Sequence, residues 1–245
     1  YTTLFRSSEA VVKLGQKPNL CILFSDVLKT SGETVMEQLT IVTGGELPIV
    51  GGISSDSWRF TDAKQFCNKI SSDTISPFLL LAGEFDFSFG MDSGWESTGE
   101  MGTITKSEGN VIYEIDYKPA LEFYSNILGE NTKPTLELPI DVYDDHGDFC
   151  FMRTSFENYD INTGSITYLG NVPVGYKVCI TMVNRESILA GAKSSITHAF
   201  RTFPANKLPV LALCFSCSAR RVLLGTRTIE ECQIVRENSG RSEEH

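Results

Sequence analysis

Thiol, hydroxyl and guanidinium groups gather where an apolar stretch of the sequence ends, between Pro209 and Gly225. The apolar residues 209–217 predict a buried strand, because such strands are continuous apolar runs. The end of a strand is where a fold presents polar groups to a ligand, and an arginine there can bind a carboxylate through two parallel hydrogen bonds. The alternative is a core strand followed by a solvated turn. The polar groups at this strand end are Cys214, Ser216, Cys217, Ser218, Arg220 and Arg221.

A second candidate binding segment is Gly51-Gly-Ile-Ser-Ser-Asp56, which is predicted to follow a strand. Glycines at a strand end let a small molecule approach the backbone, and the side chains of Ser54 and Asp56 offer hydrogen bonds. Trp95 could line the same pocket, although packing at a domain junction is the alternative. We therefore expect one ligand-binding pocket formed by Gly51, Gly52, Ser54, Asp56, Trp95, Cys214, Ser216, Cys217, Arg220 and Arg221.

The sequence lacks the common catalytic motifs: phosphate-binding and dinucleotide-binding glycine loops and the Gly-x-Ser-x-Gly elbow are all absent. Cys214 and Cys217 have Cys-x-x-Cys spacing, but no second ligand pair completes a zinc site. We expect no catalytic residue, no metal ligand and no enzyme activity. The alternative is an enzyme with Cys214 or Cys217 as nucleophile, whose thiolate Arg220 and Arg221 would favour. No histidine is evidently placed to act as its base.

Neither the acidic run nor the histidines give a clear metal or haem site. Residues 141–148 lack the ligand spacing of a calcium-binding loop and predict a solvated turn. On a helical wheel His198 faces away from the apolar side of its helix, so we expect it in solvent. The cofactor stays unknown, and haem stays an alternative.

Composition narrows the class of protein further. The 245 residues carry a formal net charge of −10 without a long basic run, which argues against binding to nucleic acid or to anionic membranes. The apolar runs fall far short of the roughly 20 residues of a membrane span, so we expect no membrane insertion. Seven cysteines, an odd number in mostly apolar surroundings, are typical of reduced thiols in a cytoplasmic protein.

Helical and strand patterns alternate along the chain and predict an α+β fold. We expect two related halves, residues 1–132 and 133–245, joined at the polar segment 129–134. Each half would hold a mainly antiparallel or mixed sheet, a hairpin and packing helices. The expected helices are 6–15, 35–42, 119–129, 188–203 and one from 228 onward; the strands are 21–24, 48–55, 76–85, 136–143, 176–183 and 209–217; the hairpins are 102–116 and 149–170.

Taken in order, several stretches resemble the FIST family, a sensory module with an N-terminal and a C-terminal half. In the first half these are Leu47-Pro-Ile-Val-Gly-Gly-Ile-Ser-Ser-Asp56 and Gly94-Trp-Glu-Ser-Thr-Gly99. In the second half they are Gly170-Asn-Val-Pro-Val-Gly175 and Phe215-Ser-Cys-Ser-Ala-Arg220. The chain departs from the family after Asn238, where a further strand is usual, so we expect the C-terminal half to be incomplete.

The resemblance implies a non-catalytic, cytoplasmic domain of bacterial signal transduction that senses amino acids or similar small molecules. Its partner would be a signalling protein such as a histidine kinase or a cyclic-dinucleotide enzyme. Some relatives are haem-binding nitric oxide sensors, and others are substrate-recruiting modules of eukaryotic F-box proteins. These two roles are the alternatives that the resemblance leaves open.

Overall fold

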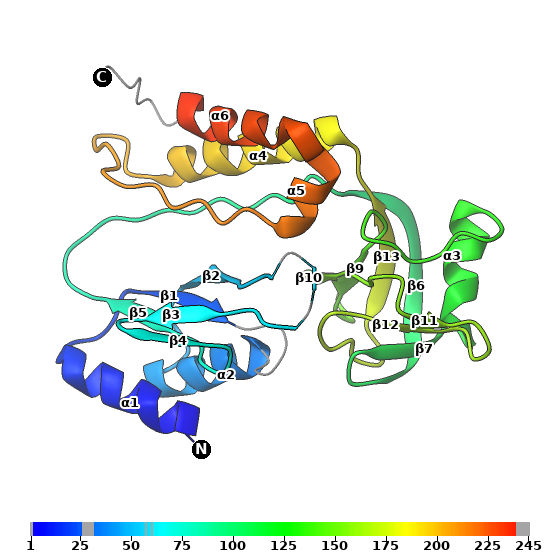
Figure 1. Cartoon of the computed structure of the whole chain (residues 1–245), viewed down its shortest axis with the longest axis horizontal. Helices are drawn as coiled ribbons and strands as arrows, with labels where there is room; N and C mark the ends of the chain where they lie inside the picture. Colours follow the sequence, from blue (N-terminus) through cyan, green and yellow to red (C-terminus); the bar gives the residue numbers. More distant parts are fainter. Residues whose placement is uncertain (1, 26–31, 57, 60, 239–245) are drawn as a thin grey trace. The chain divides into compact units, whose positions relative to one another are not determined.

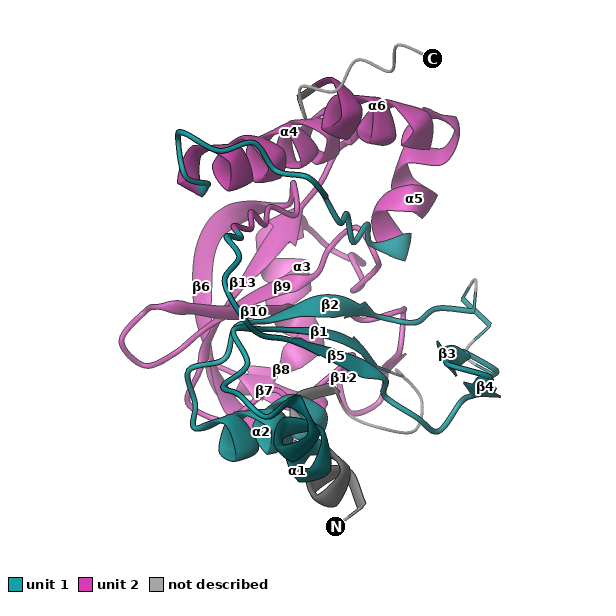
Figure 2. Ribbon diagram, turned by 90° about the vertical axis from the view of Figure 1, so that its left-hand side faces the viewer, with its two compact units in different colours: residues 1–87, 203–218 teal, residues 88–202, 219–245 magenta. Residues whose placement is uncertain are grey.

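The computed structural model describes residues 2–25, 32–56, 58, 59 and 61–238, which form an α+β protein with one mixed sheet and otherwise antiparallel pairing (Figure 1). The chain divides into two compact units, coloured separately in Figure 2. Unit 1 holds residues 1–87 and 203–218, and unit 2 holds residues 88–202 and 219–245. The expected boundary between residues 132 and 133 falls inside unit 2.

Unit 1 is built around a three-stranded sheet in the order β2-β1-β5. Strand β1 is parallel to β2 and antiparallel to β5, and α2 makes the connection from β1 to β2. Helices α1 and α2 lie on one side of this sheet (Figure 1), where Val35 and Leu39 of α2 pack on Cys21 and Leu23. The elements are α1 (Thr2–Leu14), β1 (Leu20–Ser25), α2 (Gly32–Thr43), β2 (Ile49–Ile53), the β3–β4 hairpin (Gln65–Cys67 and Ile70–Ser72) and β5 (Phe78–Leu81).

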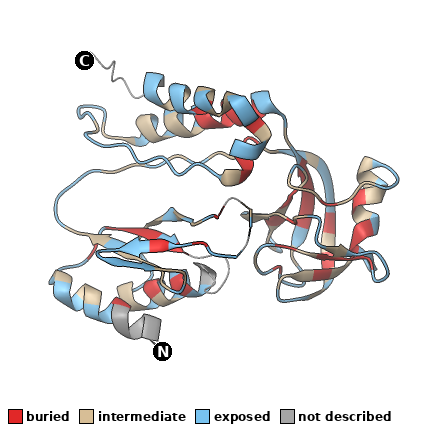
Figure 3. Ribbon diagram, viewed as in Figure 1, coloured by how far each residue is buried: buried red, intermediate tan, exposed pale blue. Residues whose placement is uncertain are grey.

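Unit 2 contains an antiparallel sheet in the order β10-β9-β13-β6-β7-β12-β11, with β8 paired to β7. The long strand β6 pairs with β13 along its first part and with β7 along its second. Helix α3 (Ala120–Leu128) covers the core of this sheet, visible as buried stripes in Figure 3. The strands are β6 (Glu96–Glu108), β7 (Val111–Ile115), β8 (Lys118–Pro119), β9 (Ile140–Tyr143), β10 (Phe149–Arg153), β11 (Tyr159–Asp160), β12 (Ser165–Thr167) and β13 (Lys177–Met182).

A helical layer completes unit 2: α4 (Arg185–Thr202) and α6 (Thr228–Asn238) lie side by side, and α5 (Ser218–Leu224) leads into α6 through a short 3₁₀ turn at Gly225–Arg227 (Figure 1). Ile188, Leu189 and Leu224 form its small core. The segment before β6 lies against α4 so closely that a Cβ on Gly94 would fall 2.5 Å from the Ser187 carbonyl oxygen. Only glycine fits there.

The expected buried strand at residues 209–217 is wrong. All of these residues are described, and they form neither a strand nor part of the core. Leu208, Val210 and Leu211 are 89%, 83% and 70% exposed. A strand needs a neighbour for its backbone hydrogen bonds, and among the described residues neither β2 nor β5, the outer strands of the three-stranded sheet, pairs with this segment. The segment therefore remains extended and exposed, and helix α5 follows it.

The expected hairpin at 149–170 is also partly wrong. Strand β10 pairs with β9 rather than with β12, while β11 and β12 form a shorter hairpin of their own. The acidic residues 144–148 make the turn between β9 and β10, where the Asp144 carboxylate accepts hydrogen bonds from the backbone N–H groups of His146 and Asp148, both at 2.9 Å. The prediction of a solvated turn in the acidic run is confirmed for this part.

Candidate functional site

The carboxyl ends of the two parallel strands of unit 1 bring together the first group of expected binding residues. Strands β1 and β2 pair from Cys21 with Ile49 to Ser25 with Ile53, so Ser54 leaves the sheet beside Ser25. Gly51 permits this pairing: its φ is +151°, and a Cβ there would lie 1.8 Å from the Leu23 carbonyl oxygen. In sheets with parallel strands, ligands bind outside the carboxyl ends of the strands.

A compact hydrogen-bond network surrounds the end of β1. The Ser25 carbonyl oxygen accepts from Ser54 N at 2.9 Å, from Ser54 Oγ at 3.2 Å and from Gln65 Nε2 at 3.1 Å. Gln65 Nε2 also lies 2.5 Å from Ser54 Oγ. Gln65 is only 3% exposed, so its side chain is held within this network.

Two polar atoms at this end of the sheet are buried without a hydrogen-bond partner in the described part of the chain: Gln65 Oε1 and Ser76 Oγ. Ser76 lies at the same end because Phe24 N donates to the carbonyl oxygen of Pro77 at 2.9 Å, directly before β5. An unpaired buried polar atom costs about 1–3 kcal/mol. Both atoms therefore keep an unused capacity for hydrogen bonding at this end of the sheet.

Asp56 has a structural role at the start of the following loop. One oxygen of its carboxylate accepts from Thr61 N at 2.7 Å and from Asp62 N at 3.1 Å, and Arg59 Nε donates to its carbonyl oxygen at 2.9 Å. Asp56 is 9% exposed. These contacts fix the loop that follows Ser54.

An aromatic pair joins the segment Cys214–Cys217 to the same sheet. The ring centroids of Phe24 and Phe215 lie 5.9 Å apart, and a Cβ on Gly52 would lie 3.8 Å from Phe215 Cδ1. The structure thus brings the glycine segment of β2 close to residue 215. Cys214, Ser216 and Cys217, which flank the ring, are exposed.

The remaining expected residues belong to unit 2, and Arg220 is already paired there. Its Nη2 lies 2.6 Å from Glu231 Oε1 and donates to the Ile188 carbonyl oxygen at 3.2 Å, while Nη1 donates to the Asp92 carbonyl oxygen at 3.0 Å. Arg220 and Glu231 are 9% and 4% exposed. This geometry makes Arg220 a link between α5, α6 and the segment before β6, whereas Arg221 is exposed.

Trp95 is half-buried in unit 2, at the end of the turn that packs on α4. Its backbone N–H donates to Ser93 Oγ at 3.1 Å, and its indole Nε1 is buried without a partner among the described residues. Because Trp95 and the glycine segment belong to different units, the single pocket that joins them stays a prediction.

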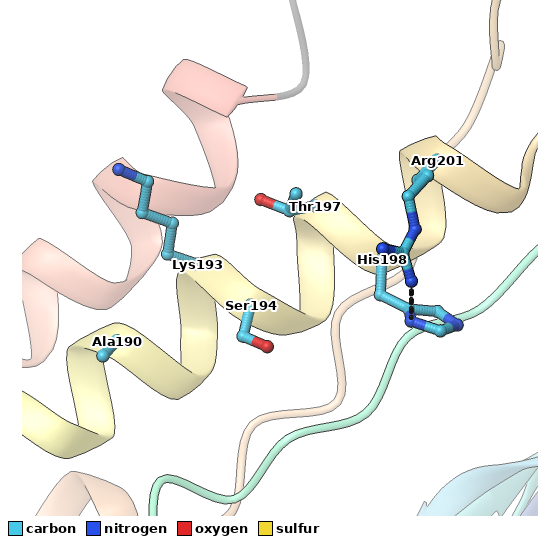
Figure 4. A pocket seen from close by; sticks show the side chains of 6 residues that line it. All are labelled: Ala190, Lys193, Ser194, Thr197, His198 and Arg201. Carbon is cyan, nitrogen blue, oxygen red and sulfur yellow. Dashed lines mark hydrogen bonds between the residues drawn. The ribbon is translucent and has the colours of Figure 1, made fainter.

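A shallow hollow on the surface of α4 presents basic side chains (Figure 4). Arg201 Nη2 and His198 Nδ1 are 3.5 Å apart, and both residues are exposed, as the helical wheel predicted for His198. His146 and His198 belong to unit 2, whereas Cys214 and Cys217 belong to unit 1. Within the described ranges no cluster of three or more His, Cys, Asp or Glu residues could hold a metal ion. The hollow is lined by Ala190, Lys193, Ser194, Thr197, His198 and Arg201.

Sequence reasoning missed Gln65 and Ser76. Gln65 lies on the three-residue strand β3, too short for a periodic pattern, and Ser76 precedes an apolar strand. Neither position carries a local signal, because their importance comes from contacts with distant residues: Gln65 meets Ser54 and Ser25, 11 and 40 positions away, and Ser76 lies beside the end of β1. Among the described residues, no helix is both long enough and apolar enough to cross a membrane.

Comparisons with known proteins place the chain in a family. Over 108 residues it is 33% identical to an uncharacterized protein of Methanocaldococcus jannaschii; the match covers 43% of this chain and 20% of that protein, so the chain spans about a fifth of its relative. No solved structure matches it. The FIST N domain model matches residues 2–118, and the FIST C domain model matches residues 120–242. The chain therefore belongs to the FIST family, with an N-terminal and a C-terminal FIST domain in sequence.

Proposed function

We propose that the chain is a non-catalytic sensory domain that binds a small polar molecule at the carboxyl ends of β1 and β2. The observation that carries the proposal is the pair of buried, unpartnered atoms at that end, Gln65 Oε1 and Ser76 Oγ. A carbonyl oxygen needs a donor, and a hydroxyl both donates and accepts. An amino acid or a similar small molecule, with an ammonium group and acceptor oxygens, meets both requirements.

The neighbouring groups support the same site. Ser54 and Gln65 already hold one another in place, so binding costs little ordering of these side chains. Phe24 and Phe215 supply an apolar surface next to Gly52. A rigid polar network beside an aromatic surface is the usual composition of a small-molecule site.

The output of such a sensor lies in another protein or another part of a longer one. Ligand binding would change the affinity for that partner by a coupling of about 1–3 kcal/mol. A histidine kinase or a cyclic-dinucleotide enzyme is the proposed partner, and the net charge of −10 favours a basic docking surface on it. The seven cysteines, which the structure gives as thiols rather than disulfides, support a cytoplasmic location. The kinship of the two FIST halves stays a prediction.

A thermal-shift screen with the twenty amino acids and related small acids tests the binding step. A ligand at a hundred times its dissociation constant stabilises the chain by about 2.7 kcal/mol, which raises Tm by roughly 5–10 °C in a chain of this size. The same screen with hemin, read by its absorption, tests the haem-sensor alternative, and thiol labelling with substrate turnover tests the cysteine-enzyme alternative.

Ser76→Ala locates the site. Because the hydroxyl of Ser76 has no partner in the described structure, its removal should leave the Tm of the free protein unchanged or higher. The dissociation constant of the ligand should rise about 2- to 10-fold, the worth of one neutral hydrogen bond. Ser71→Ala, at an exposed position of β4 in the same unit, is the matched control. Equal ligand affinity in both variants would refute this site, and a screen without any stabilising molecule would refute ligand sensing.

A further inference from the structure

A half-buried carboxylate, that of Asp141, lies on the sheet of unit 2, well apart in sequence from the residues of the proposed sensory site. Asp141 is on β9, where burial alternates: Ile140 and Val142 belong to the core, and Asp141 and Tyr143 lie on the opposite face. Oδ1 of Asp141 is buried and has no hydrogen-bond partner among the described residues, and no ion pair within them includes Asp141. A carboxylate oxygen taken out of water without a hydrogen-bond partner is costly.

Tyr143, two residues along β9, contacts this carboxylate and belongs to an aromatic pair. Tyr143 OH donates to Asp141 Oδ2 at 3.4 Å. The ring of Tyr143 packs edge-on against Phe149, with centroids 5.9 Å apart and an angle of 77° between the planes. Phe149 is directly opposite Tyr143 in the β9–β10 pairing and is 52% exposed, so one side of the aromatic pair is open to solvent.

Polar groups of the neighbouring strands complete the surroundings. Cys179 of β13 is opposite Asp141 in the pairing, and its Sγ lies 2.9 Å from Ser97 Oγ and 3.5 Å from Thr98 Oγ1. Cys179 itself is fully buried, whereas Ser97 beyond it is exposed. Desolvation raises the pKa of Asp141, which the hydrogen bond from Tyr143 only partly offsets.

We propose that Asp141, Tyr143 and Phe149 form a binding site for an organic ammonium group. The free oxygen of Asp141 accepts a charge-assisted hydrogen bond from the ammonium N–H, and the aromatic faces contact the charged head and the attached carbon atoms. The ligand is an organic cation rather than a metal ion, because a single carboxylate beside aromatic rings lacks the several oxygen ligands that hard cations require. The inference does not rest on the proposed sensory site, whose residues belong to unit 1.

Calorimetric titration of the full chain with butylammonium chloride tests the site. Asp141→Asn keeps the shape and removes the charge, and it should raise the dissociation constant about ten- to a hundredfold, as expected for a hydrogen bond to a charged group. Asp145→Asn is the matched control: it removes the same charge from an exposed position of the adjoining turn and should leave the affinity within twofold. Phe149→Leu should weaken binding by about two- to fivefold, the worth of an exposed cation–π contact.

Butanol and potassium chloride separate the contribution of the organic ammonium group from those of the alkyl chain and of charge alone. Neutral butanol should not bind, and potassium at equal ionic strength should not displace the amine. No saturable binding of butylammonium, equal affinity of the Asp141→Asn and Asp145→Asn variants, or displacement by potassium would each overturn the proposal.

The wild-type chain supplies a test that needs no variant. A carbon-detected NMR titration should give Asp141 a pKa above the ordinary aspartate range, and bound butylammonium should lower it, because a cation favours the charged form. A pKa of Asp141 that does not move when butylammonium is added would overturn the site.

Discussion

Replacing Glu231 by glutamine should strongly destabilise unit 2, because it leaves the guanidinium group of Arg220 buried without a counter-ion. The two charged groups are in contact, with Arg220 Nη2 2.6 Å from Glu231 Oε1, and both residues are at least nine-tenths buried. The other hydrogen bonds of Arg220 go to the carbonyl oxygens of Asp92 and Ile188, which carry no net charge. Glutamine keeps the size of the side chain and removes only the charge.

The expected loss in the free energy of unfolding is about 3–5 kcal/mol, the usual cost of breaking a buried ion pair by removing one partner. Replacing both residues by methionine should recover much of this loss, because neither charge is then left alone. Glu230→Gln is the matched control, since the pair of Arg227 and Glu230 is only 2.7 Å apart but accessible to solvent. It should change stability far less than Glu231→Gln.

Urea unfolding followed by the fluorescence of Trp95 measures the effect on unit 2, in a Trp58→Phe background that silences the other tryptophan. The midpoint should fall at an unchanged slope for Glu231→Gln, and it should stay near that of the parent for Glu230→Gln. Equal midpoints of the two variants would refute the reasoning that burial makes the Arg220–Glu231 pair decisive.

Two further outcomes follow from close packing and burial in unit 1. In thermal melts, Gly51→Ala should lower the free energy of unfolding by on the order of 3 kcal/mol, because its Cβ would lie 1.8 Å from the Leu23 carbonyl oxygen at a φ of +151°. Gly45→Ala is the control: with a φ of +87° and no atom within 4 Å, it should cost about 1 kcal/mol. Equal losses in the two variants would contradict the packing argument. Burial raises the pKa of the Cys21 thiol to about 11, so mass spectrometry after alkylation at pH 8 should find it far less labelled than the exposed cysteines. Labelling of Cys21 at the rate of Cys67 would show that β1 is open to solvent.

The elements with local signals were predictable from the sequence. The hairpin at 102–116 forms as β6 and β7, with its turn at Gly109, which has a φ of +56°. Helix α3 begins after Pro119 and ends at Gly129, as these residues indicated. In each case a proline, a glycine or an apolar period fixes the structure within a few residues of itself.

Features that depend on distant residues were not predictable. An apolar run indicates that burial is favourable, but it does not show whether the segment will pair with a neighbouring strand, and residues 209–217 form no strand in the structure. Arg220 was expected to meet a ligand carboxylate because the sequence does not show that Glu231 faces it. The network around Ser25 includes Gln65, 40 residues away, for the same reason. The glycine segment of the candidate site was found from sequence, and its buried partners were not.

The return of the chain to unit 1 sets an order for folding during synthesis. Residues 203–218 contribute the ring of Phe215 and the ion pair of Lys207 with Asp86 to a unit whose other residues all precede residue 88. A ribosome adding about 5–20 residues per second needs roughly 6–25 seconds to make the intervening residues of unit 2. During that interval Phe24 has no Phe215 to pack against, so unit 1 completes its packing only after residues 203–218 have emerged.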